Sequence, residues 1–162
     1  MKALLTAVII LGFLSLPFCQ EMSSKTASKM DTAKTDTSKK WHVDPKDKGI
    51  GPVKNVKLGP INTKLANEGK SLFNSNCSSC HAMDHKVVGP PLGEVTEQRT
   101  PEFIMNMILN APVMEQKDSK VQALVQQYHV HMPQTGLTEK QARAVLEYFR
   151  ETAKKEEKGE KH

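Results

Sequence analysis

The residues best suited to chemistry in this chain are two cysteines, Cys77 and Cys80, followed directly by His81. Cysteines three positions apart project from the same side of one helical turn, so both thiols can bond the two vinyl groups at one edge of a haem. The adjacent histidine can then present a ring nitrogen to the iron. The Cys-x-x-Cys-His spacing therefore predicts covalent haem attachment through Cys77 and Cys80, with His81 as an iron ligand.

Two other chemistries remain open for this cluster. A thioredoxin-type dithiol would need an α/β framework, and the sequence shows no strand-helix-strand alternation. A structural zinc site would recruit His85, which puts four ligands within nine residues and leaves the metal nothing to tie together. The apolar leader also favours haem, because c-type haem attachment takes place after export.

That leader occupies the first 19 residues. Lys2 precedes an uncharged stretch, residues 3–18, which is typical of an export signal and short for a membrane span. Cys19 ends the stretch and resembles the lipid-modified cysteine of bacterial lipoproteins. We expect a protein of the periplasm, or otherwise outside the cytoplasm, tethered to a membrane through Cys19. An uncleaved N-terminal anchor and a spectator cysteine are the alternatives.

Charge separates the rest of the chain into segments. Residues 20–60 hold nine lysines against five acidic residues and are rich in Ser, Thr, Gly and Pro, which predicts a flexible arm and linker that Trp41 and Ile50 pin to the domain. Residues 61–153 hold nine basic and ten acidic residues and form the predicted domain, followed by a charged tail, 154–162. A nearly neutral domain argues against nucleic-acid binding.

Helical patterns bracket the cysteine motif. Asn62 or Thr63 is predicted to cap a helix through Phe73, and Thr138 with Gln141 forms a capping box that opens a second helix. Two further helices are expected, over 100–111 and 121–128. Gly69 lacks a side chain where the first and last helices can cross closely, with Val145 and Tyr148 filling the crossing. The expected fold class is all-α.

Residues 61–153 resemble class I monohaem cytochromes c. The Cys77 to His81 motif, Val88-Gly89-Pro90 after it and Met132-Pro133 before Leu137-Thr138 match the pattern of that family. The resemblance implies a small helical domain wrapped around one covalently attached haem c. It also implies that the Pro90 carbonyl accepts the ring N–H of His81, and that Met132 is the second iron ligand. It covers neither the signal, the arm nor the tail.

Several residues compete with Met132 for the iron. Met114, expected in a loop, remains possible, and His129 or His131 would give bis-histidine ligation and a lower reduction potential.

Met105 and Met107 lie at helical spacing and are expected in the core. Met83 and His85 are too close to His81 to reach the opposite haem face.

A haem whose two axial positions are filled by protein has no open site for a substrate. We therefore expect a monomeric carrier of single electrons rather than an enzyme, which meets its redox partners transiently. The partner would be a respiratory enzyme. Residues 47–52 and 106–110 resemble tethered cytochromes associated with nitrous-oxide reductase, and a terminal oxidase is the other candidate. The alternative is a haem-based sensor in which an exogenous ligand displaces Met132.

Overall fold

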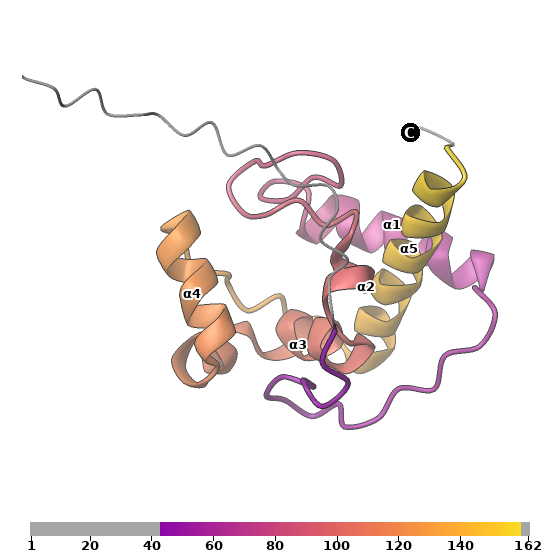
Figure 1. The fold of residues 1–162 in the computed structure, drawn as a ribbon. Coiled ribbons are helices and arrows are strands. Elements are labelled where there is room, and N and C mark those ends of the chain that lie inside the picture. The colour runs from indigo at the N-terminus through magenta and orange to yellow at the C-terminus, as the bar shows by residue number, and fades with distance from the viewer. Residues whose placement is uncertain (1–42, 160–162) are drawn as a thin grey trace, which may run out of the picture. The chain divides into compact units, whose positions relative to one another are not determined.

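The computed structural model describes residues 43–159, so the leader, Cys19 and Trp41 lie outside the described residues. The helices are α1 (Thr63–Asn76), α2 (Val95–Gln98), α3 (Pro101–Lys117), α4 (Ser119–Tyr128) and α5 (Glu139–Glu157) (Figure 1). Extended pairing in this part of the chain is limited to one antiparallel bridge between His81 and Lys86. No helix within residues 43–159 is both long and apolar enough to cross a membrane.

The first and last helices begin where the sequence predicts. Asn62 caps α1, and its side chain accepts the N–H of Leu65 at 3.0 Å. Thr138 and Gln141 form the capping box of α5, with each side chain bound to the backbone of the other residue. Each cap satisfies backbone donors that the first helical turn would otherwise leave unpaired. Both predictions are confirmed.

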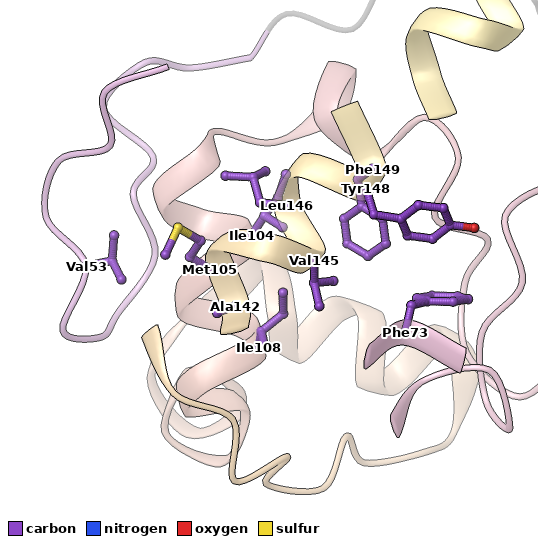
Figure 2. Packing of buried hydrophobic residues seen from close by; sticks show 10 residues of the cluster. All are labelled: Val53, Phe73, Ile104, Met105, Ile108, Ala142, Val145, Leu146, Tyr148 and Phe149. Atoms are coloured by element: carbon purple, nitrogen blue, oxygen red, sulfur yellow. The ribbon is translucent and has the colours of Figure 1, made fainter. Parts of the chain in front are cut away.

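The core lies where α5 meets α1 and α3 (Figure 2). On α1, the ring of Phe73 lies 5.5 Å from Tyr148 and 5.9 Å from Phe149, both on α5. Aromatic rings at this separation and tilt contribute beyond the area they bury. The other members of the cluster are Val53, Ile104, Met105, Ile108, Ala142, Val145 and Leu146.

Residues 47–56, here called the strap, pack on α3 instead of forming the flexible linker that their composition predicts. Val53 is buried in the core, at 3% exposure. The buried side-chain amide of Asn106 accepts the N–H of Val53 at 2.9 Å and donates to the carbonyls of Val53 and Lys48 at 2.8 and 2.9 Å. One buried amide thus satisfies strap backbone groups that would be costly to bury unpaired.

Helix α3 extends past the predicted end at residue 111. The backbone breaks at Asn110 (φ −148°, ψ 33°), just before Pro112, and then continues helically to Lys117. Proline has no N–H for the preceding turn and its ring crowds that turn, so it kinks a helix without always ending it. Met114 consequently lies in a helix rather than in the expected loop, fully buried beside Phe103 and Val121.

Helix α4 packs against α3 and directs the chain toward the final loop. The carboxylate of Asp118 caps it, accepting the N–H groups of Lys120 and Val121 at 2.9 and 3.2 Å. It ends at His129, which adopts the left-handed conformation at φ 56°. The single-turn helix α2 was not predicted from the sequence.

Candidate functional site

The cysteine motif follows directly on α1. Cys77 is the C-cap of that helix, and its carbonyl accepts the N–H groups of Cys80 and His81 at 3.0 and 2.9 Å. Cys77 and Cys80 form no disulfide, and both line the same cavity. The helical pattern of α1 therefore leads directly to the placement of the two thiols.

Residues 88–90 fold back against His81 and fix its ring. The Cys80 carbonyl accepts the N–H groups of Val88 and Gly89 at 3.1 and 2.8 Å, and Nδ1 of His81 lies 2.8 Å from the carbonyl oxygen of Pro90. A carbonyl can only accept, so Nδ1 carries a proton, and in the neutral ring the lone pair is then on Nε2. A histidine held in this way is prepared to donate Nε2 to a metal ion.

Gly89 provides the space that the imidazole occupies. A Cβ built on Gly89 would lie 2.5 Å from Cε1 of His81, well inside van der Waals contact. The absence of a side chain at position 89 thus lets the backbone pass directly against the ring.

The loop between α4 and α5 carries Met132 to the same cavity. The N–H of Met132 donates to Oε1 of Glu115 at 2.6 Å, and Nδ1 of His131 donates to Oε2 of the same carboxylate at 2.8 Å. The side chain of Glu115 is only 11% exposed. The loop is therefore anchored to α3 at Met132, the residue that the family resemblance selects as an iron ligand.

One cavity of about 250 Å³ unites these elements. Cys77, Cys80, His81, Pro90 and Met132 all contribute to its wall, so the five residues selected from the sequence come together. Most of the remaining wall is apolar, and α3, α4 and α5 supply a large part of it. That part includes Phe103, Ile104, Met107, Ile108, Val121, Leu124, Val125, Val145 and Phe149.

This cavity fits the haem that the motif predicts. It combines two unpaired thiols, an imidazole with a free Nε2, a thioether and an apolar wall, which are the groups a covalently attached haem requires. Burial, and secondarily the neighbouring Cys80, raise the pKa of the Cys77 thiol. A raised pKa is the opposite of what an activated thioredoxin-type nucleophile needs. Within residues 43–159, no three His, Cys, Asp or Glu side chains gather as a zinc site would require.

The competing ligand candidates lie in different places. Met114 is fully buried and absent from the cavity wall, and Met105 is buried in the main core. His129 is exposed at the end of α4 and His85 pairs with Asp84, so neither forms part of the wall. Met107 and His131 do line the cavity and remain the nearest rivals of Met132.

Three other residues of the cavity wall were not selected from the sequence as parts of the site. Tyr128 stands under the ammonium group of Lys86, 4.9 Å from its ring centroid, and so links α4 to the segment after His81. Arg99 lies 5.2 Å from the ring centroid of Phe103 and is the one Lys or Arg among the described residues of the wall. Glu115 follows the kink of α3. In the sequence, the only signal near Glu115 is Pro112, three positions before it.

Comparison with known proteins agrees with this site. Residues 66–153 match the model of the family described as Cytochrome c. A solved cytochrome c from Rhodothermus marinus is 46% identical, with a TM-score of 0.63, over 64% of this chain and 90% of that chain. An engineered form of that cytochrome, bound to a carbene intermediate, is also 46% identical, with a TM-score of 0.60 over 64% and 91% of the two chains. A search of curated proteins finds no significant match.

Proposed function

Because the chain belongs to the cytochrome c family and is a haem c electron-transfer protein, we propose that His81 and Met132 are the two axial ligands of its iron. One haem c is attached covalently, at the motif that contains Cys77 and Cys80. The haem supplies the one-electron Fe(II)/Fe(III) couple. The fold is the all-α fold of class I cytochromes c.

The observation that carries this proposal is the shared cavity. Met132 approaches from the loop after α4, whereas His81 approaches from the segment after α1, and both line the same space. The Pro90 carbonyl fixes the proton of His81 on Nδ1, which supports Nε2 as the ligand atom. Met114, fully buried in the core, has no comparable approach.

Electron transfer needs ligands that move little between oxidation states. His81 is held by Pro90 and by the Gly89 backbone, and the Met132 loop is held by Glu115. These contacts hold the His81 ring and the backbone of Met132 in place. If His81 and Met132 both bind the iron, no coordination position would be left for a substrate, which supports a carrier over an enzyme.

The surface beside the motif suits brief encounters with redox proteins. Val87 and Val88 are 43% and 42% exposed, directly before Gly89 and Pro90. A small exposed apolar area favours weak, short-lived docking. Cytochrome c proteins typically act outside the cytoplasm. We expect the partner to be a respiratory enzyme, with nitrous-oxide reductase and a terminal oxidase as the candidates, and we expect a monomer tethered through Cys19.

Optical spectra test the proposal directly. The protein is exported together with a c-type maturation system and measured oxidised and then reduced. Low-spin bands together with the weak near-red band of methionine-ligated ferric haem are the expected result. High-spin bands would instead support a ligand-binding sensor. Low-spin bands without the near-red feature would move the second ligand to His131.

A further inference from the structure

We infer that Glu115 is a positioning residue for Met132, acting with the kink of α3 to hold the ligand loop closed over the cavity. The inference rests on the proposed role of Met132 as an iron ligand. Glu115 itself binds no iron in this account. It acts only through its hydrogen bonds to the backbone N–H of Met132 and to the ring of His131.

The carboxylate of Glu115 binds two consecutive loop residues. Oε1 accepts the backbone N–H of Met132 at 2.6 Å, and Oε2 accepts Nδ1–H of His131 at 2.8 Å. Hydrogen bonds to a carboxylate are shorter and roughly twice as strong as neutral ones. With a side chain 11% exposed, Glu115 is also shielded from competing water.

The kink of α3 supplies a second attachment, on the other side of Met132. In a regular helix the Ile108 carbonyl would accept the N–H of residue 112, but Pro112 has none. The hydroxyl of Thr135 donates to that carbonyl instead, at 2.8 Å. The side-chain amide of Gln134 donates to the next carbonyl, that of Leu109. The loop is thus bound to one helix both before and after Pro133.

Closure of the loop governs whether another ligand can reach the iron. An exogenous ligand would bind only when Met132 has moved away. Its apparent affinity is therefore its intrinsic affinity multiplied by the fraction of molecules whose loop is open. Loss of the Glu115 hydrogen bonds enlarges that fraction. The expected effect is about tenfold or more, the factor that one hydrogen bond to a charged group produces.

The test is an imidazole titration of the ferric, haem-loaded protein. Glu115→Ala is expected to bind imidazole at least about tenfold more tightly than the wild type, whereas Glu115→Gln, which keeps a neutral acceptor for the Met132 N–H but loses the carboxylate oxygen that accepts from His131, should show a smaller increase in affinity. Glu151→Ala is the matched control, because Glu151 is a partly buried helical glutamate paired with Lys155 and absent from the cavity wall. Equal tightening in the Ala and Gln variants would show that the acceptor for the Met132 N–H contributes nothing, and would overturn the inference. No change in the Ala variant would overturn it as well.

Hydrogen exchange at the Met132 amide provides a readout that does not depend on the identity of the iron ligand. Exchange should accelerate most in Glu115→Ala, less in Glu115→Gln, and remain at the wild-type rate in Glu151→Ala. A wild-type protein without the near-red band would refute the proposed ligand, whereas an unchanged exchange rate would refute the role of Glu115. If Glu115→Ala yields no loaded protein, Glu115→Asp withdraws the carboxylate by one methylene, and wild-type affinity and exchange in that variant would overturn the inference.

Discussion

Gly69 lies directly against the backbone of Ala144, so closely that a Cβ built on Gly69 would fall 1.9 Å from the Ala144 carbonyl oxygen. Position 69 is therefore restricted to glycine for as long as α1 and α5 keep their present separation. Because Cys77 is the C-cap of α1, the crossing also positions the helix that leads into the haem motif.

Gly69→Ala should separate the two helices. Alanine normally stabilises a helix relative to glycine, but the clash here involves backbone that cannot turn aside. We expect a loss of about 3 kcal/mol in the free energy of unfolding, measured by denaturant titration of the haem-loaded protein. Gly59→Ala is the control, because nothing lies within 4 Å of a Cβ at that position. Equal stability of the two variants would contradict the close crossing.

Gly89→Ala should disturb His81 rather than the helical core. A Cβ at position 89 would lie 2.5 Å from Cε1 of His81 and push the imidazole away from its Pro90 partner. We expect less covalently attached haem and altered bands in the optical spectrum, with the helical circular dichroism of the remaining loaded protein unchanged. A wild-type spectrum in this variant would show that the ring does not need the space at position 89.

Asn106→Ala should release the strap from α3. The substitution leaves the N–H and C=O of Val53 and the carbonyl of Lys48 without their side-chain partner. Each unpaired buried group costs about 1–3 kcal/mol, so we expect a loss of at least about 2 kcal/mol and faster proteolysis within residues 47–56. Asn74→Ala, at an exposed position of α1, is the control and should leave both quantities near wild type.

The buried carboxylate of Glu147 predicts a specific response to acid. Burial raises its pKa, but hydrogen bonds and charges from Arg143 and Arg150 outweigh burial and hold the pKa below the ordinary value. Because the folded-state pKa is the lower one, the stabilisation is present at neutral pH and is lost as pH falls below about 4.3, the ordinary pKa of a glutamate.

Glu147→Gln removes that titration. The variant should melt several degrees below the wild type at pH 7, and the gap between the two melting temperatures should narrow as pH falls below about 4. A gap that stays constant down to pH 3 would contradict a lowered pKa for Glu147. Arg150 also donates to the Gly59 carbonyl, so the arginine itself should remain ordered in the variant.

Local sequence patterns are enough to predict where the first and last helices of the domain begin. Asn62 and Thr138 mark their helices because capping depends on the few residues that follow each of them. The haem motif is equally local, since its spacing alone places both thiols. Resemblance to the family, rather than spacing, singled out Pro90 and Met132.

The features that the sequence did not reveal depend on contacts distant along the chain. The strap reads as a linker because its glycines and prolines favour no regular element, and its backbone groups are satisfied by side chains of α3 that lie 46 to 60 residues away, those of Glu102, Asn106 and Asn110. The sequence predicts a helix that ends at residue 111, yet the helix continues beyond the kink, with Met114 packed against Phe103 and Val121. Nothing in the sequence marks Glu115 itself, because glutamates are usually exposed and its loop partners lie 16 and 17 residues further on.

The most direct test of the central claim is the ferric spectrum and reduction potential of haem-loaded Met132→Ala beside Met107→Leu, since both methionines line the cavity. We predict that Met132→Ala loses the near-red band, binds exogenous ligands and has a lower potential, because a methionine ligand raises the potential. Met107→Leu should keep the wild-type band and a potential close to that of the wild type. Retention of the band in Met132→Ala, or its loss in Met107→Leu alone, would contradict the assignment of Met132 as the second ligand of the iron.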